Sequence, residues 1–268
     1  MRSISLTSSS ITQKIYRFAN IEVDFLYFCI YSTFYLGNTL TEIAGEKAGI
    51  IKAGVPVVIG ETTPETKVAF LTTSNRLDSE IIFAEKLDLP EIPSDLNGLY
   101  QHENKRTVLA AIQTLKKLNL VSVSEDDIYA GFSHVVETTG LLGRWQQLGV
   151  NPLVIADTAH NAHGLARVVA QIERQIYQKL HFVLGVVTDK DLSTILPLLP
   201  KNAQYYFCKP EGQRGLNAEI LMNEAVKFGL SGSWHASVTD AFMAARENAS
   251  AMDMIYIGGS TFVVAEIL

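Results

Sequence analysis

The stretch IADTAHNAHG, residues 155–164, sets a short apolar run directly before Asp157, His160 and Asn161. The apolar run predicts a buried strand, and the polar residues after it have two interpretations. Asp and Asn side chains cap helices and form turns, so an ordinary turn explains the cluster. A ligand site also explains it, because open parallel sheets bind their ligands outside the carboxyl ends of strands.

From about residue 150 onward, short apolar runs alternate with segments of helical periodicity. This alternation predicts an α/β domain with a mostly parallel sheet and helices on both faces. The predicted strands are 152–157, 180–187, 203–209 and 253–259. The predicted helices are 162–178, 189–199, 217–229, 238–249 and 261–268. Asn151 and Pro152 predict the turn of a hairpin whose second strand ends at Asp157.

The part of the chain before residue 140 has a less regular pattern. A helix is predicted to begin at Thr39, where Glu42 completes a capping box, and to stop at Gly54. The remaining predicted elements are strands 55–60 and 80–86, helices 63–77 and 101–119, a helix capped by Ser124, and a polar loop 88–98. A domain boundary is predicted within 138–145, because the regular alternation begins just after it.

Composition excludes several classes of protein. Apolar residues make up 47% of the 268 residues and charged residues 19%, so a sizeable core forms and disorder is excluded. The net charge of −6 argues against nucleic-acid and anionic-membrane partners. Two cysteines, Cys29 and Cys208, are no disulfide framework and predict a cytoplasmic protein. The apolar stretch 25–36 is too short for a membrane span, and Lys14 and Arg17 interrupt any secretory signal.

Lys47 lies on the apolar stripe of the predicted helix that begins at Thr39. Leu40, Ile43, Lys47 and Ile50 recur at three- and four-residue steps and therefore share one face. In one interpretation the aliphatic stem packs while the amine reaches water. In the other, partial burial lowers the pKa of the amine, and the neutral amine reacts with carbon dioxide to give a carbamate. A carbamate is a carboxylate on a long arm that can hold a metal ion.

Three strand ends in the C-terminal half are candidates for one shared crevice: the ends after Asp157, within 186–191 and within 256–262. Capping by Asn161, Thr188 and Ser260 is the simpler explanation of their polar residues. A metal site on His160 and His163 and a Ser260–His160–Asp157 triad are weaker alternatives. The sequence has no third metal ligand near the histidines, no G-x-S-x-G elbow and no G-x-G-x-x-G fingerprint.

Two longer stretches carry a family resemblance. LGNTLTEIAGEKAGIIKAGVPVVIGE (36–61) and the motifs GRW (143–145) and DTAHN (157–161) resemble the folylpolyglutamate synthase/dihydrofolate synthase family of the Mur ligase superfamily. HENKR (102–106), VVTDKD (186–191) and YIGGSTFVV (256–264) follow in the family's order. The resemblance runs from about Leu36 to the end of the chain.

The resemblance implies a fold and a domain organisation. Residues 36–140 correspond to the C-terminal part of a Mur-ligase central ATPase domain. Residues 141–268 correspond to the Rossmann-like C-terminal glutamate ligase domain, with a mostly parallel sheet. Residues 1–35 do not resemble the family and stay unassigned.

The resemblance also implies a chemistry. ATP, with Mg²⁺, converts the carboxylate of a folate or dihydropteroate to an acyl phosphate, and the amine of L-glutamate attacks it. Lys47 corresponds to the carbamylated lysine beside magnesium. The ATP-binding positions are Asn104, Arg144 and Asp157, and the glutamate-site positions are His160, expected to be catalytic as well, and Ser260. These small molecules are the expected partners of a monomer.

Two departures from the family pattern qualify this expectation. The 268 residues contain no G-x-x-x-x-G-K-[ST] phosphate loop, and Ser32 stands where the family places a metal-binding His. We therefore expect a truncated copy that is inactive by itself. The alternatives are a non-catalytic remnant that binds nucleotide or glutamate, and a Mur-type amino-acid ligase with another acceptor.

Overall fold

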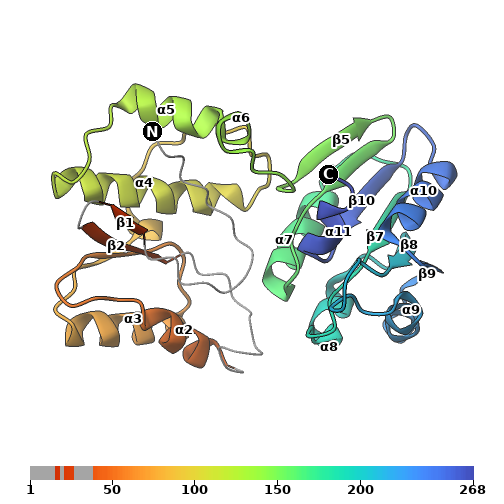
Figure 1. Ribbon diagram of the computed structural model, residues 1–268, viewed down its shortest axis with the longest axis horizontal. Helices are drawn as coiled ribbons and strands as arrows, with labels where there is room; N and C mark the ends of the chain where they lie inside the picture. Colours follow the sequence, from red (N-terminus) through yellow and green to blue (C-terminus); the bar gives the residue numbers. More distant parts are fainter. Residues whose placement is uncertain (1–15, 19–20, 27–38) are drawn as a thin grey trace. The chain divides into compact units, whose positions relative to one another are not determined.

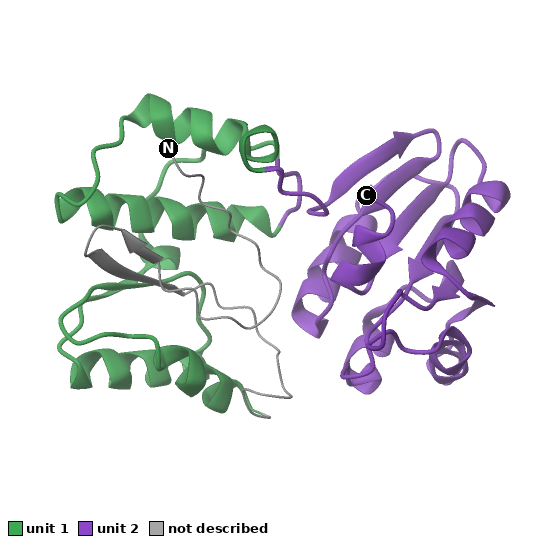
Figure 2. Ribbon diagram, viewed as in Figure 1, with its two compact units in different colours: residues 1–95, 100–139 green, residues 96–99, 140–268 purple. Residues whose placement is uncertain are grey.

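The computed structural model describes residues 16–18, 21–26 and 39–268, and these form two compact units. Residues up to 95 together with 100–139 make the first unit, and residues 96–99 with 140–268 make the second (Figure 2). Cys29, Ser32 and most of the apolar stretch 25–36 lie outside the described residues. Within the described ranges, no helix is both long and apolar enough to cross a bilayer.

The first unit is built on a four-stranded sheet with the order β1-β2-β3-β4. Its strands are β1 (Tyr16–Phe18), β2 (Ile21–Leu26), β3 (Val57–Ile59) and β4 (Ile81–Phe83). Strands β2, β3 and β4 are parallel, and β1 pairs antiparallel with β2. The helices are α2 (Leu40–Ala48), α3 (Pro64–Arg76), the 3₁₀ turn η1 (Ala84–Lys86), α4 (Gln101–Lys117), α5 (Glu125–Ser133) and α6 (Val135–Thr139).

Helices cover both faces of this sheet, with α2 and α3 on one side and α4 and α5 on the other (Figure 1). The side chains of β3 contribute to the hydrophobic cores on both faces of the sheet, because successive side chains of a strand point to opposite faces. Val57 and Ile59 pack with Phe70 of α3, whereas Val58 packs with Leu109 of α4 and its neighbours. All three β3 side chains are fully buried.

The second unit is a six-stranded sheet with the order β5-β6-β10-β7-β8-β9. Its strands are β5 (Gln146–Val150), β6 (Leu153–Ala156), β7 (Leu180–Leu184), β8 (Ala203–Cys208), β9 (Ser231–His235) and β10 (Met254–Gly258). Only β5 runs antiparallel to its neighbour, so the predicted α/β fold with a mostly parallel sheet is confirmed.

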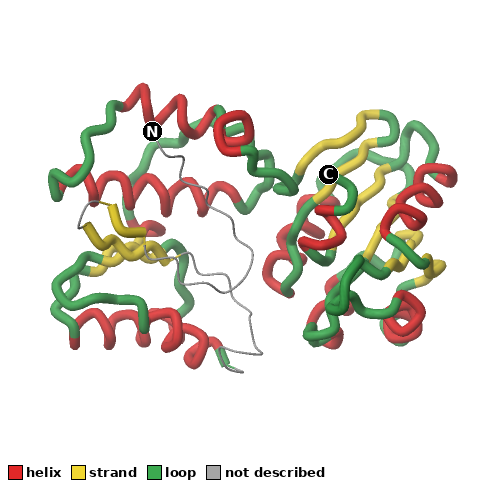
Figure 3. Tube along the Cα trace, in the orientation of Figure 1, coloured by secondary structure: helices red, strands yellow, loops and turns green. Residues whose placement is uncertain are grey.

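Helices alternate with these strands along the chain (Figure 3). They are α7 (Ala162–Ile172), α8 (Leu192–Ile195) with the 3₁₀ turn η2 (Leu196–Leu198), α9 (Ala218–Val226), α10 (Val238–Asn248) and α11 (Thr261–Ala265). One face of the sheet packs small and branched side chains against α10 and α11. Side chains on the opposite face of the sheet form an aromatic layer. The ring centroid of Phe182 lies 5.2 Å from that of Tyr205 and 4.7 Å from that of Tyr256.

Several predicted boundaries need correction. Helix α2 ends at Ala48 with Gly49 as its C-cap, so Gly54 is not the helix stop; Gly54 adopts φ +71° in the turn before β3. Helix α7 ends at Ile172 rather than residue 178, because the chain must return to β7, and Ile176 is 93% exposed. The helix predicted over 189–199 is a single turn followed by a 3₁₀ turn, since Pro197 cannot donate a helical hydrogen bond.

Strand β9 was not predicted. Its sequence SGSWH lacks an apolar run, and its register comes entirely from pairing with β8. Gly232 permits that pairing, because a Cβ at this position would lie 2.1 Å from the carbonyl oxygen of Tyr205.

A buried hydrogen-bonded contact between Asp253 and His181 joins the starts of two neighbouring strands, β7 and β10. The Asp253 carboxylate accepts the backbone N–H groups of Lys179 at 3.0 Å and Ser250 at 2.7 Å, and lies 3.4 Å from His181 Nε2. Burial alone would raise the pKa of Asp253, but the hydrogen bonds from Ser250, His181 and Lys179 outweigh it and lower the pKa.

We predict that Asp253→Ala lowers the free energy of unfolding by about 2–3 kcal/mol, because buried donors lose their acceptor. Urea unfolding measures this, with the exposed Asp88→Ala as the control. A lowered folded-state pKa means that the stabilisation is complete above the unfolded-state pKa and is lost as pH falls through the folded-state pKa. The gap between the unaltered chain and Asp253→Ala should therefore shrink in acid, and a constant gap would contradict the assignment.

Candidate functional site

The carboxyl ends of β6, β10 and β7 lie side by side in the second unit. The crossovers β6–α7–β7 and β9–α10–β10 run in opposite directions along the sheet, so α7 and α10 cover opposite faces. Helix α11 follows β10 and packs in the same core as α10. The chain thus leaves the adjacent ends of β6 and β10 toward opposite faces, which is the arrangement that opens a ligand crevice in parallel sheets.

Backbone contacts hold the residues after β6 and β10 together. The N–H of Asp157 donates to the carbonyl of Ile257 at 3.0 Å, and the Tyr256 hydroxyl donates to the carbonyl of Asp157 at 3.4 Å. A Cβ on Gly258 would lie 2.7 Å from the Asp157 carbonyl oxygen, so a glycine is required at this approach. Asp157 and Ser260 therefore follow neighbouring strands at one end of the sheet, as predicted.

The Asp157 carboxylate fixes the turn that carries Arg144. It is 1% exposed, and its two oxygens accept the backbone N–H groups of Trp145 at 2.6 Å and Ala159 at 2.8 Å. Trp145 adopts φ +50°, a conformation that its own side chain disfavours and that this bond helps to hold. Arg144 directly precedes Trp145, and Thr158 directly precedes Ala159. The Arg144 guanidinium donates a hydrogen bond to the Thr158 hydroxyl.

His160 is mostly buried in the same loop. Its Nδ1 lies 3.0 Å from the carbonyl of Thr158, so Nδ1 carries the proton and Nε2 is the acceptor in the neutral ring. Burial lowers the pKa of His160; the charges of Lys190 and Arg144 lower it further, against the Thr158 hydrogen bond and the opposing charge of Asp189. His160 is consequently neutral at pH 7 and can accept a hydrogen bond or a proton.

A second loop contributes residues that the sequence did not single out as site residues. Arg214 lies 3.0 Å from Asp189, and its guanidinium stands 5.9 Å from the centroid of the Phe262 ring. The backbone N–H of Thr188, which follows β7, donates to the carbonyl of Arg214 at 2.9 Å. This bond holds the loop after β8 against the end of β7. Lys190 belongs to the VVTDKD motif, whereas no local pattern indicates that the loop holding Arg214 returns to β7.

The capping interpretation is correct for two residues and wrong for the third. Asn161 caps α7 by accepting the N–H of Gly164 at 2.7 Å, and Ser260 caps α11 by accepting the N–H of Phe262 at 3.2 Å. Thr188 caps nothing, because α8 begins later and Asp191 is its N-cap. The backbone of Thr188 is instead engaged with the loop of Arg214.

Neither weaker alternative is supported by the geometry. His163 Nε2 accepts from Arg167 at 2.9 Å and His160 Nδ1 faces the carbonyl of Thr158, so protein groups already engage one nitrogen of each ring. That same His160 contact occupies the nitrogen that a catalytic triad would direct at Asp157. Within the described ranges, no group of three or more His, Cys, Asp or Glu side chains is placed to hold a metal ion.

Lys47 and Asn104 lie in the first unit. Lys47 is partly buried on α2, between exposed Glu46 and buried Ala48, which agrees with either interpretation of its side chain. The Asn104 amide donates to Gln101 Oε1 at 2.7 Å. Its oxygen is buried and meets no hydrogen-bond partner among the described residues, so it is an acceptor suited to a ligand.

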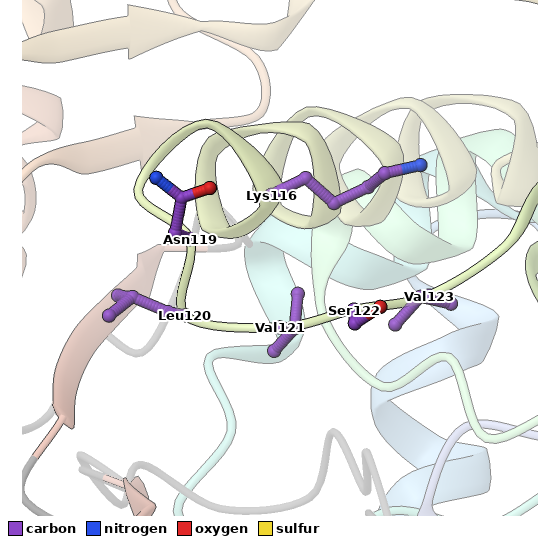
Figure 4. A pocket seen from close by; sticks show the side chains of 6 residues that line it. All are labelled: Lys116, Asn119, Leu120, Val121, Ser122 and Val123. Atoms are coloured by element: carbon purple, nitrogen blue, oxygen red, sulfur yellow. The ribbon is translucent and has the colours of Figure 1, made fainter.

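Two shallow hollows lie on the described part of the first unit, at its β3–α4 end and at the end of α4. One, of about 220 Å³, is lined by Gly60, Glu61, Glu85, His102, Glu103 and Arg106, at the carboxyl end of β3 and the first turns of α4. The other, of about 350 Å³, is lined by Lys116 and residues 119–123. Its polar ends, on Lys116 and Asn119, point in opposite directions (Figure 4). The second hollow therefore assembles no functional groups.

Comparison with known proteins finds a family model and relatives that are similar to this chain. Residues 143–261 match the family model for the Mur ligase, glutamate ligase domain. The dihydrofolate synthase/folylpolyglutamate synthase of Escherichia coli strain K12 is 28% identical over 88% of this chain and 56% of its own length. The chain thus spans little more than half of that relative. The predicted resemblance to folylpolyglutamate/dihydrofolate synthases is confirmed.

Solved structures agree. E. coli FolC in complex with DHPP and ADP has a TM-score of 0.76 and 27% identity, covering 89% of this chain and 58% of that one. A bifunctional folylpolyglutamate synthase/dihydrofolate synthase with Mn, AMPPNP and L-glutamate bound has a TM-score of 0.73 and 25% identity, covering 87% and 57%.

We predict that Asp157→Ala lowers the free energy of unfolding by about 3 kcal/mol, because two backbone N–H groups around a strained turn lose a buried acceptor. Chemical denaturation measures the change. Asp189→Ala serves as the control, since its ion pair is partly exposed and should cost no more than about 1 kcal/mol. Equal effects of the two variants would refute the structural role of Asp157.

Proposed function

We propose that this chain is the part of an ATP-dependent ligase that joins L-glutamate to a folate or to dihydropteroate. The observation that carries the proposal is the grouping of Arg144, His160 and Ser260 at the ends of β6 and β10. These are the positions that the family resemblance assigns to nucleotide and glutamate. ATP, glutamate and the pterin acid are then the small-molecule partners.

Each unit, taken by itself, contains residues with the chemistry of nucleotide contacts. The buried amide oxygen of Asn104 suits the exocyclic amine of adenine, and the Arg144 guanidinium suits phosphate oxygens. Asp157 supports Arg144 through the backbone, because its carboxylate accepts the N–H of the next residue, Trp145.

A magnesium ion does not fit the described residues by themselves, because they contain no grouped metal ligands. When bound, the ion would neutralise charge on the transferred phosphoryl group. A carbamate on Lys47 would add one carboxylate toward such an ion.

The residues of the second unit suit the amide-forming step. The ammonium of glutamate must lose a proton before its nitrogen attacks the acyl phosphate and displaces phosphate. His160, neutral at pH 7 with Nε2 as acceptor, can orient that amine and take the proton. Ser260 accepts a cap bond yet keeps its hydroxyl proton to donate to a substrate carboxylate.

We further propose that the 268 residues alone bind nucleotide and glutamate without turnover. Phosphoryl transfer relies on a loop of backbone N–H groups and a lysine around the phosphates. The chain contains no G-x-x-x-x-G-K-[ST] sequence that would supply them. A ligase part that binds without turnover and a remnant that only binds nucleotide or glutamate therefore have the same expected behaviour.

We predict no labelled product when the purified chain is incubated with ATP, Mg²⁺, a folate and radiolabelled glutamate. Binding of an ATP analogue should be measurable by calorimetry, and Arg144→Gln should weaken it about tenfold, equivalent to about 1.4 kcal/mol. Arg246→Gln, which alters an arginine over Phe242 on α10, is the matched control. Product formed at a rate typical of an intact enzyme would overturn the claim of inactivity, and product only with another acceptor would favour a different Mur-type ligase.

Carbamylation of Lys47 is tested without activity. With ¹³C-labelled bicarbonate, the chain should give a carbamate carbon resonance that is absent from Lys47→Arg and present in Lys52→Arg. Retention of the resonance in Lys47→Arg, or its absence from the unaltered chain with Mg²⁺ present, would leave the solvent-reaching lysine as the correct interpretation.

A further inference from the structure

Two lysines of the first unit converge on one aromatic ring at the carboxyl end of β4. Lys67 Nζ lies 5.1 Å from the centroid of Phe83, and Lys86 Nζ lies 5.5 Å from the same centroid. Lys67 comes from α3 and Lys86 from η1, so two separate elements bring the amines together. Each ammonium gains from the face of the ring, but each also repels the other.

The neighbouring carboxylate does little to relieve this repulsion. The Glu85 carboxylate accepts two hydrogen bonds from Thr62, one from the hydroxyl at 2.7 Å and one from the backbone N–H at 3.1 Å. The Glu85 oxygens are therefore directed at the loop after β3. Lys67 also lies in the first turns of α3, where the positive end of the helix dipole disfavours another cation. The local structure thus favours removal of one proton from the pair.

The effect falls on Lys67. The Lys86 amine, as its immediate neighbour, is the largest cause that lowers the pKa of Lys67; partial burial and the charge of Lys86 act in the same direction, and Glu85 opposes them. Lys67 is partly buried but reachable, and Lys86 is exposed. A lysine beside another cation is a recognised way to produce a nucleophilic amine.

We propose that Lys67 is a modification site that reacts with acyl phosphates, with Lys86 holding the phosphate. The neutral Nζ of Lys67 attacks the carbonyl carbon of the acyl phosphate and a C–N bond forms. The C–O bond to phosphate breaks, inorganic phosphate leaves beside the Lys86 ammonium, and Nζ gives up one proton to water. The product is an N-acyl lysine, which ends the repulsion between the two amines.

The test uses the full chain and acetyl phosphate as the probe. Peptide mass spectrometry follows the acetylated fraction of each lysine with time. Lys67 should react at least about threefold faster than Lys117, whose amine is engaged in an ion pair with the Glu80 carboxylate at 3.0 Å. Equal rates at Lys67 and Lys117 would overturn the proposal.

Variants separate charge from structure. Lys86→Gln should slow acetylation of Lys67 at least about threefold, and Lys86→Arg should restore it, because the guanidinium keeps the positive charge. Lys227→Gln, at a remote ion pair with Glu224, is the matched control and should leave the rate at Lys67 unchanged. An unchanged rate in Lys86→Gln, or an equal loss in Lys86→Arg, would refute the role of Lys86.

A neutral acetyl ester tests the class of donor. Lys86→Gln should slow acetylation by acetyl phosphate more than acetylation by the ester, because only the first reagent carries a phosphate for Lys86 to attract. An equal loss with both reagents would overturn the assignment of acyl phosphates as the donor class.

Discussion

The buried carboxylate of Asp157 is the interaction on which the proposed site depends. It stands directly after β6 and binds backbone N–H groups on both sides, at Trp145 before β5 and at Ala159 before α7. A single side chain therefore closes the end of the sheet and sets the path of the loop that carries His160. Burying a carboxylate is costly unless donors surround it, and here the polypeptide supplies them. The hydrogen bonds from Trp145 and Ala159 offset the cost of burying the carboxylate, and they also fix the positions of the polar groups around it.

A neutral histidine among positive charges follows from this geometry. Arg144 and Lys190 raise the potential around His160, while burial removes water that would stabilise an imidazolium. The same charges favour the binding of an anion at this place. The two cations therefore act in two ways. They attract an anion, and they keep His160 unprotonated so that it can accept a proton at neutral pH.

Local signals were predicted well from the sequence and long-range ones were not. The capping box at Thr39 and the helix cap at Ser124 are confirmed, because each depends only on residues within four positions of one another. The order of strands around β10 and the return of the Arg214 loop to β7 depend on pairings between distant segments. Strand β9 was missed for the same reason: its partner β8, rather than its own composition, makes it a strand. The contact of Asp157 with Trp145 could not be read from the DTAHN motif, since Trp145 lies twelve residues away.

The choice between a turn and a ligand site, which the polar residues after β6 first raised, is not a choice between exclusive roles. Ser260 illustrates the reason: its oxygen accepts the cap bond from Phe262, while its hydroxyl proton can still be donated. Asp157 accepts two backbone N–H groups and in this way holds the loops on which Arg144 and His160 lie. A residue that caps a helix at a strand end is held in one rotamer by that bond, so its remaining donor or acceptor has a fixed direction. Capping therefore prepares such a residue for ligand binding, and the structural role of these side chains is the physical basis for the functional role proposed for them.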